Sequence, residues 1–128
     1  MVGIVVVTHS QKLAEGVVET AKMLAAKANI VAAGGLPDGS LGTNFARIQA
    51  AVEEVASDDG VLILMDMGSA VMTAEMVQED MDEENIVLVD CPLVEGAVVA
   101  ALHASLGESL EAVKKVAEEA RNTEKIAR

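Results

Sequence analysis

Four short runs of apolar residues recur along the chain at intervals of about 25–30 residues, the size of a βαβ unit. Each run is rich in Val, Ile and Leu and does not alternate apolar with polar positions. This pattern is typical of strands that are covered on both faces, as in a parallel sheet. In chain order, the runs are Val2–Thr8, Asn29–Ala33, Gly60–Asp66 and Asn85–Asp90.

The stretches between these runs carry apolar residues at helical spacing. The alternation of strands and helices predicts an α/β fold, an open and mainly parallel four-stranded sheet with helices on both faces and right-handed crossovers. We expect the methionines Met65, Met67, Met72, Met76 and Met81 to pack in the core and at its rim. The predicted helical positions are Leu13, Val17, Ala21 and Leu24, then Ile48, Val52 and Val55, then Met72, Met76 and Val77, then Ala97–Leu106, and finally Leu110, Val113, Ala117 and Ala120.

Length and composition restrict the possible functions of this chain. Its 128 residues predict one domain, 1–128, and 52% hydrophobic residues are enough for a core. Nine Lys and Arg against 21 Asp and Glu give a net charge of −12, which argues against a nucleic-acid or anionic-membrane partner. One cysteine excludes an internal disulfide. No apolar run reaches the length of a membrane span and no basic leader is present, so we expect a cytoplasmic protein.

Polar residues follow three of the four apolar runs at the point where each run ends. They are Thr8-His9-Ser10, Asp66-Met67-Gly68-Ser69 and Asp90-Cys91-Pro92. Ligands of open α/β sheets bind beyond the carboxyl ends of the strands. Ser10 and Ser69 each precede a predicted helix and resemble N-caps, and helix N-termini attract anions. Two such helix starts side by side would form a phosphate site.

His9 is the strongest candidate for chemistry, because a neutral imidazole is a nucleophile near pH 7. If the first and third strands are neighbours, Asp66 lies beside His9 and accepts a hydrogen bond from one ring nitrogen, which leaves the other nitrogen to attack. Ser69 can then donate its hydroxyl and backbone N–H to the group that His9 carries. These residues predict a phosphohistidine, whereas the more ordinary interpretation is a surface histidine next to a helix cap.

Other chemistries fit the same residues less well. A serine hydrolase needs the sequence G-x-S-x-G, but the chain reads Met67-Gly68-Ser69-Ala70-Val71. A receiver-type phosphoaspartate at Asp66 requires a carboxylate cluster after the first strand, where Thr8-His9 stands. The glycine-rich segment Gly34–Gly42 has no following lysine, so it is not a nucleotide-binding P-loop.

Three further features are interpreted as structural. The acidic run Glu79–Glu84 lacks the spacing of a calcium loop and predicts a solvated helix end. Cys91 ends an apolar strand and is expected to be a small packed thiol rather than a nucleophile. His103 is expected on a helix surface or partly packed. We therefore predict no metal site.

Four segments, in the expected order, resemble motifs of the phosphotransferase subunit of dihydroxyacetone kinases that are driven by the phosphoenolpyruvate:sugar phosphotransferase system (PTS). They are Thr8-His9-Ser10, Leu41-Gly42-Thr43, Met65-Asp66-Met67-Gly68-Ser69-Ala70 and Pro92-Leu93-Val94-Glu95-Gly96. More broadly, the whole chain is similar to mannose-type enzyme IIA (EIIA) domains. The Asp-Met-Gly-Ser-Ala and Pro-Leu-Val-Glu-Gly segments are more typical of the dihydroxyacetone branch than of mannose transporters.

The resemblance implies the mannose-type EIIA fold and a phosphocarrier role in glycerone metabolism. His9 matches the position that takes a phosphoryl group from the phosphohistidine of the carrier protein HPr, and Asp66 matches the residue that orients this histidine. The positions near the phosphoryl group are Ser69, Gly68, Ser10, Thr8 and Thr43.

The family resemblance also implies partners and cofactors. The subunit passes its phosphoryl group to ADP, which stays bound with Mg²⁺ on the nucleotide-binding kinase subunit, and a third subunit holds dihydroxyacetone and receives the phosphoryl group from ATP. We therefore expect this chain to bind no cofactor itself and to form a homodimer. Some relatives continue into further phosphotransferase domains, whereas this sequence ends at Arg128 and predicts separate HPr and enzyme I. Asn122–Arg128 is short and charged, and does not predict the extra strand that mannose-type domains exchange across their dimer.

Two other functions stay open at this point. A mannose-type sugar-transport component would share the first step but pass the phosphoryl group to the cytosolic domain of a membrane complex. A non-catalytic regulator of the same fold would bind a small anion or a partner without covalent chemistry at His9.

Overall fold

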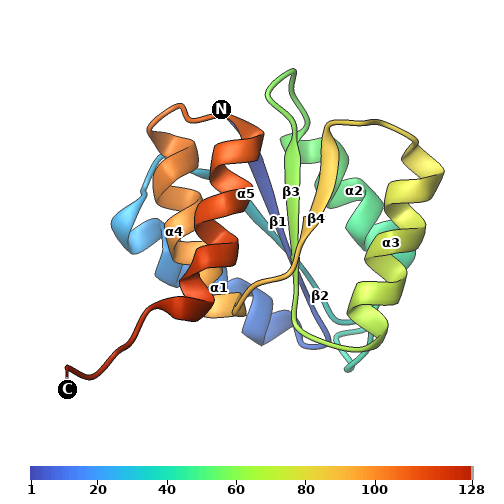
Figure 1. The fold of residues 1–128 in the computed structure, drawn as a ribbon. Coiled ribbons are helices and arrows are strands. Elements are labelled where there is room, and N and C mark those ends of the chain that lie inside the picture. Colours follow the sequence, from blue (N-terminus) through green and yellow to red (C-terminus); the bar gives the residue numbers. More distant parts are fainter. Residues whose placement is uncertain (128) are drawn as a thin grey trace.

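A computed structural model describes residues 1–127 of the chain as a parallel four-stranded sheet with the strand order β2-β1-β3-β4 (Figure 1). Each strand lies within one residue of a predicted apolar run, so the predicted α/β fold is confirmed. The strands are β1 (Gly3–Thr8), β2 (Asn29–Gly34), β3 (Val61–Met65) and β4 (Ile86–Val89).

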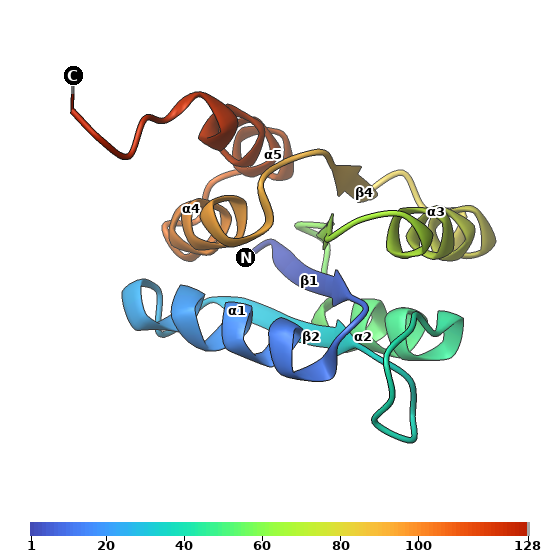
Figure 2. The ribbon, with the colours of Figure 1, turned by 90° about the horizontal axis from the view of Figure 1, so that it is seen from below.

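Helices cover both faces of this sheet. The helices α1, α4 and α5 pack on one face, and α2 and α3 pack on the other, as Figure 2 shows in a view along the sheet. Helix α4 begins four residues before the predicted Ala97, directly after Pro92, which is its N-cap and has φ −60°. The helices of the described residues are α1 (Gln11–Leu24), α2 (Phe45–Val55), α3 (Ser69–Met81), α4 (Leu93–Ser105) and α5 (Leu110–Glu119), followed by a 3₁₀ turn at Ala120–Asn122.

The two central strands explain why the apolar runs are continuous. All six residues of β1 are buried, because it has a neighbouring strand on each side and helices on each face. Successive side chains point to opposite faces. Ile4 and Val6 therefore join the core under α1, α4 and α5, whereas Val5 and Val7 join the core under α2 and α3.

The inward face of α3 differs from the prediction. Met67, Met72 and Met76 are all exposed, so their assignment to the core and its rim is wrong. Small side chains let the helix backbone lie close to the sheet, and the long methionines point to solvent instead. The buried residues of α3 are Ala70, Ala74 and Val77.

Helix α1 shows the same effect at its ends. Val17 and Ala21 of the predicted stripe are buried together with Ala14. Leu13 and Leu24 are exposed, so the stripe is narrower than predicted. In both α1 and α3, two of the three buried residues are alanines, although leucine and methionine on the same helices are more hydrophobic.

The chain ends and the acidic segment match their predictions where the structure describes them. Residues 123–127 form no strand, as expected for Asn122–Arg128, while Arg128 lies outside the described residues. Helix α3 ends at Met81 inside the acidic run, with Asp82 as a left-handed C-cap at φ 47°. Within residues 1–127, every helix is too short or too polar to cross a membrane.

Candidate functional site

The pairing of β1 with β3 brings His9 and Asp66 together. The parallel register places Val7 opposite Met65, and each polar residue follows closely after its strand. The Asp66 N–H donates to the carbonyl of Val7 at 3.0 Å, and the His9 N–H donates to Oδ2 of Asp66 at 3.0 Å. The sequence-based expectation that these residues become neighbours is thus confirmed, and the carboxylate is held by the strand ends themselves.

The same carboxylate determines the tautomer of the His9 ring. Nδ1 of His9 lies 2.9 Å from Oδ1 and 3.1 Å from Oδ2 of Asp66. An ionised carboxylate only accepts hydrogen bonds, so Nδ1 carries the proton and Nε2 has the lone pair. Oδ1 also accepts the N–H of Met67 at 2.7 Å, which fixes its direction.

Nε2 of His9 faces the start of α3. It lies 2.8 Å from Oγ of Ser69, whose hydroxyl donates to the ring lone pair. Ser69 is the first residue of α3 and Gly68 is the N-cap, so the prediction of Ser69 as an N-cap is wrong. Gly68 has φ 48° and ψ −115°, a conformation that favours glycine, and this turn directs the Ser69 hydroxyl toward His9. Ser10, in contrast, caps α1 as predicted, accepting the N–H of Leu13 at 3.2 Å.

A chain of hydroxyl groups extends from Ser69 to Thr43, which lies two residues before the start of α2. Thr43 Oγ1 donates to Ser69 Oγ at 3.3 Å and lies 3.1 Å from Thr73 Oγ1. Thr73 Oγ1 in turn donates to the carbonyl of Ser69 at 2.8 Å. Thr73 was not predicted as a site residue from the sequence. Its position one helical turn after Ser69 was the available signal, because residues four apart share a helix face.

Close contacts with neighbouring segments also fix the backbone around His9, in addition to the hydrogen bond from its N–H to the Asp66 carboxylate. The buried hydroxyl of Thr8 donates to the carbonyl of Ser10 at 2.5 Å, and the N–H of Gly42 donates to the carbonyl of His9 at 2.8 Å. A Cβ at Gly34 would lie 2.5 Å from the Ser10 carbonyl oxygen, so only glycine lets β2 approach this turn. Thr8 and Ser10 therefore support the loop, and their phosphoryl-binding role stays a prediction.

The side chains of His9 and Asp66 are partly exposed. The His9 side chain is 28% exposed and that of Asp66 is 12% exposed. The first turn of α3, which begins at Ser69, lies next to Nε2 of His9. Its N–H groups have no acceptor within the helix, and the positive end of the helix dipole lies at the same point. The geometry thus combines a neutral nucleophilic nitrogen, an orienting carboxylate, a hydroxyl donor and a helix N-terminus.

Cys91 and His103, which were interpreted as structural, take no part in the hydrogen bonds around the His9 ring, although Cys91 lines one hollow together with Asp66. Burial raises the pKa of the Cys91 thiol to about 11, which favours the neutral form expected of a packed thiol. His103 Nδ1 pairs with Glu108 at 2.6 Å at the end of α4. Among residues 1–127, there is no group of three or more His, Cys, Asp and Glu side chains that could hold a metal ion.

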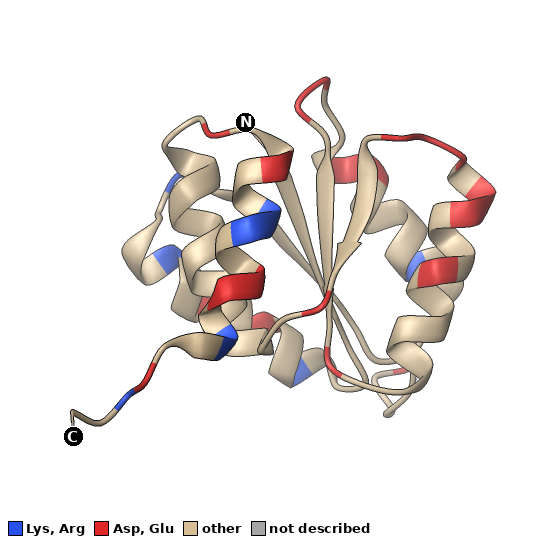
Figure 3. Ribbon diagram, viewed as in Figure 1, with Lys and Arg blue, Asp and Glu red and all other residues tan. Residues whose placement is uncertain are grey.

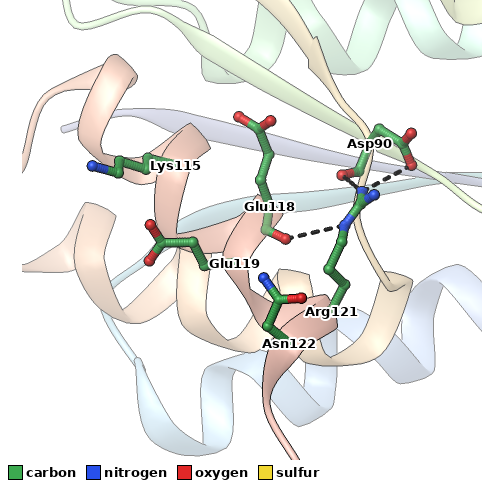
Figure 4. Close-up of a pocket in the computed structure, with 6 residues that line it drawn as sticks. All are labelled: Asp90, Lys115, Glu118, Glu119, Arg121 and Asn122. Atoms are coloured by element: carbon green, nitrogen blue, oxygen red, sulfur yellow. Dashed lines mark hydrogen bonds and ion pairs between the residues drawn. The ribbon is translucent and has the colours of Figure 1, made fainter.

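The third polar strand end forms a separate ion pair. Asp90 follows β4, and its Oδ1 lies 3.2 Å from the guanidinium of Arg121, which also donates through Nε to the carbonyl of Glu118 at 3.2 Å (Figure 4). These residues border an open hollow of about 420 Å³ beside α5. Asp90 thus pairs with the C-terminal turn. It also lines a second hollow of about 480 Å³ together with Asp66, but it takes no part in the hydrogen bonds that join His9, Asp66, Ser69 and Thr43.

Comparisons with known proteins agree with this geometry. A family model described as the PTS system fructose IIA component (EIIA-man) matches residues 3–114. The phosphotransferase subunit DhaM of the PTS-dependent dihydroxyacetone kinase of Lactococcus lactis is 37% identical over 88% of this chain and 90% of its own length. The phosphoryl donor subunit DhaM of PEP-dependent dihydroxyacetone kinase 2 of Listeria innocua is 38% identical over 88% of this chain and 94% of its own length. The corresponding Escherichia coli subunit is also 38% identical, but the match covers 25% of its length.

Solved structures share the fold. The crystal structure of a protein of unknown function has a TM-score of 0.80 and 34% identity, covering 92% of this chain and 93% of its own. A sigma-54 interaction domain protein from Enterococcus faecalis has a TM-score of 0.73 and 21% identity, covering 94% of this chain and 90% of its own. This second structure supports the fold alone.

Proposed function

Because the chain belongs to the mannose-type EIIA family, and within it to the phosphotransferase subunits of PTS-dependent dihydroxyacetone kinase, we propose that His9 carries a phosphoryl group from HPr to the kinase. The acceptor in this proposal is ADP on the nucleotide-binding subunit. One observation carries the proposal: Nδ1 of His9 is bound to Asp66 while Nε2 faces the hydroxyl of Ser69.

Nε2 is the reacting atom in this proposal. Its lone pair attacks the phosphorus of the donor's phosphohistidine, a P–N bond forms, and the donor's P–N bond breaks with its electron pair returning to the donor imidazole. The Ser69 hydroxyl, which donates to Nε2 at 2.8 Å before transfer, then turns to donate to a phosphoryl oxygen. The phosphorylated ring keeps its proton on Nδ1 and is positively charged, and the Asp66 carboxylate stabilises that charge.

The surroundings suit a group that must be both accepted and released. The N-terminus of α3 contributes the equivalent of about half a positive charge toward the phosphoryl oxygens. Within residues 1–127, no Lys or Arg is hydrogen-bonded to His9, Asp66 or Ser69. A helix dipole stabilises the transferring group by positioning and electrostatics, without the tight ion pair that a fixed cation would form.

The second step reverses the first with a different acceptor. A β-phosphate oxygen of ADP attacks the phosphorus, the P–N bond of His9 breaks, and its electron pair returns to Nε2. The Mg²⁺ that accompanies ADP belongs to the partner subunit, and a third subunit transfers the phosphoryl group from ATP to dihydroxyacetone. Because Mg-ADP is bound by the partner subunit, the proposal assigns this chain no cofactor. It also includes the cytoplasmic location and the homodimeric state that were expected from the sequence.

The test is the intact mass of the chain after incubation with phosphoenolpyruvate, enzyme I and HPr. We expect the gain of one phosphoryl group that is labile in acid and absent from His9→Ala. Adding the ADP-loaded subunit should then remove the group and form ATP. No mass gain, with HPr shown to be active on another acceptor, contradicts the proposal and favours a non-catalytic regulator.

The description of the family model as a fructose IIA component favours one second candidate, a sugar-transport component. It shares the step at His9 and differs in the acceptor. Retention of the phosphoryl group in the presence of the ADP-loaded subunit, with release to a transporter domain, would identify that candidate.

A further inference from the structure

Three hydroxyl groups beside His9, those of Thr43, Ser69 and Thr73, form what we term the hydroxyl chain. Each holds one proton, so the direction of its hydrogen bonds can be assigned. Thr73 Oγ1 donates its proton to the carbonyl of Ser69 at 2.8 Å. Thr43 is therefore the donor across the 3.1 Å that separate it from Thr73 Oγ1. Thr43 Oγ1 also donates to Ser69 Oγ at 3.3 Å, so two acceptors share its single proton.

The lengths of these bonds agree with a shared proton. Hydrogen bonds between two oxygens are typically about 2.7–2.8 Å long. Both bonds of Thr43 are longer than that. The bond from Ser69 Oγ to Nε2 of His9 is 2.8 Å long. Ser69 Oγ thus accepts a hydrogen bond from Thr43 and keeps its own proton for Nε2.

The two threonines are placed to control the Ser69 hydroxyl from behind. Thr73 lies four residues after Ser69 on α3, and its bond to the Ser69 carbonyl ties it to the first turn of the helix. Thr43 comes from the segment that leads into α2. Both threonine side chains are half-buried, whereas Ser69 is exposed. Ser69 therefore faces an incoming group, and the threonines hold it from the protein side.

The hydroxyl chain is electrically neutral. Helix α3 carries no Lys or Arg, and its charged bands in Figure 3 are acidic and lie beyond its first turn. Within residues 1–127, no hydroxyl group of the chain is hydrogen-bonded to a charged side chain. A bond to a charged group is about twice as strong and would hold the Ser69 hydroxyl in one direction. Neutral partners leave it able to turn.

We propose that Thr43 and Thr73 are positioning residues that keep the Ser69 hydroxyl a donor, first to Nε2 of His9 and then to a phosphoryl oxygen. This inference rests on the proposed function. No proton leaves its oxygen, since the Ser69 hydroxyl only turns. A hydroxyl that accepts a hydrogen bond is a stronger donor, because neighbouring bonds polarise one another. It is also less able to accept from an N–H on Nε2, so the hydroxyl chain favours the same ring tautomer as Asp66.

The first test is a double-mutant cycle on the rate of phosphoryl transfer from phospho-HPr, measured by rapid quench. Thr43→Val keeps the shape of the side chain but removes its hydroxyl, and it should slow transfer about three- to tenfold. In a Ser69→Ala background there is no hydroxyl to direct, so the same replacement should slow transfer by less than about twofold. A direct contact between Thr43 and the phosphoryl group would slow transfer equally in both backgrounds, and that result overturns the proposal.

Three variants control this cycle. Thr73→Val should show the same dependence on Ser69, because it removes the group that receives the Thr43 proton. Thr20→Val is the matched control on α1, where Thr20 also donates to the carbonyl four residues before it, and it should transfer at the unaltered rate. Thr43→Ser restores the hydroxyl and should transfer within about twofold of the unaltered rate. If it is as slow as Thr43→Val, the methyl group matters rather than the hydroxyl and the proposal is wrong.

The second test requires no phosphoryl transfer. The ¹⁵N resonance of Nε2 of His9 reports the hydrogen bond that this nitrogen accepts, and Ser69→Ala gives its position without that bond. In Thr43→Val the resonance should move part of the way toward this position, whereas Thr20→Val should leave it unchanged. A resonance of Thr43→Val that coincides with that of the unaltered protein contradicts the proposal.

The outcomes also separate this inference from the function on which it rests. If the unaltered protein takes no phosphoryl group from HPr, the proposed function fails, and the Nε2 resonance still decides whether the threonines direct Ser69. If the unaltered protein is phosphorylated and Thr43→Val matches its rate, the positioning role alone fails.

Discussion

Replacing Asp66 with Asn is the sharpest perturbation of the site, because the two side chains have nearly the same shape. Both oxygens of Asp66 accept backbone hydrogen bonds, Oδ2 from His9 N–H at 3.0 Å and Oδ1 from Met67 N–H at 2.7 Å, and both lie within 3.1 Å of Nδ1. An amide has one oxygen, so one of these donors meets an NH₂ group instead.

The magnitude follows from that lost acceptor. If the amide nitrogen faces the ring, Nδ1 becomes the acceptor and the proton moves to Nε2, which blocks the nucleophile. If the amide oxygen faces the ring, the tautomer is kept but the phosphorylated ring loses its counter-charge. A hydrogen bond to a charged group contributes about 1.5–3 kcal/mol. Because about 1.36 kcal/mol corresponds to a factor of ten, the transfer rate should fall about 10- to 150-fold.

Rapid-quench measurement of phosphoryl transfer from phospho-HPr gives this rate, and ¹⁵N NMR of the ring reports the tautomer. Asp90→Asn is the matched control, since Asp90 follows the neighbouring strand β4 and its side chain is 96% exposed. It should transfer at the unaltered rate. Asp66→Asn that transfers as fast as the unaltered protein, with the Nδ1–H tautomer intact, would refute the assignment of Asp66 as the orienting residue.

Three further expectations concern the hydroxyl chain, the tight turn and the thiol. Thr73→Val should slow phosphoryl transfer about three- to tenfold in rapid-quench measurements. Thr20→Val is the control, because Thr20 on α1 likewise donates to the carbonyl four residues before it, and this variant should not slow transfer. Equal transfer rates of the two variants would contradict a role of Thr73 in the site. Gly34→Ala should lower the free energy of unfolding by about 2 kcal/mol in urea because its Cβ meets a carbonyl oxygen at 2.5 Å, while Gly16→Ala, with open space around it, should raise it by about 0.5–1 kcal/mol. With its pKa raised to about 11, Cys91 is neutral below that pH, so at pH 8 only about one thiol in 1,000 is a thiolate. Alkylation followed by mass spectrometry should accelerate about tenfold per pH unit from 8 to 10, and fast labelling at pH 8 would show that the thiol is not held neutral.

The strands and the His9–Asp66 pair were predictable from sequence because a parallel sheet imposes strong constraints. Doubly covered strands require continuous apolar runs, and polar residues at their carboxyl ends meet at one edge. Asp66 could be placed beside His9 once the strand order made β1 and β3 neighbours. The pairing itself depends on crossover topology, which a single sequence expresses only through the spacing of its elements.

Side-chain direction on α3 was less predictable. Hydrophobicity favours Met72 and Met76 as core residues, yet three smaller side chains face the sheet, since close packing of helix on sheet rewards small volume as well as apolarity. The Ser69 hydroxyl was expected at a cap, but the positive φ of Gly68 shifts the helix start by one residue. Such a local conformation has no distinct sequence signal beyond the glycine itself.

The order of strands in the sheet also determines when, during folding, the chain becomes able to accept a phosphoryl group. His9 and Asp66 are 57 positions apart, and their strands become neighbours only after two crossovers have formed. Contacts of such long sequence separation close slowly, because loop entropy is lost before the pairing stabilises the chain. A partly folded chain therefore holds its histidine without the carboxylate that orients it. Acceptance of a phosphoryl group should appear during refolding only as the β1–β3 pairing forms, so that the chemistry itself reports the completion of the sheet.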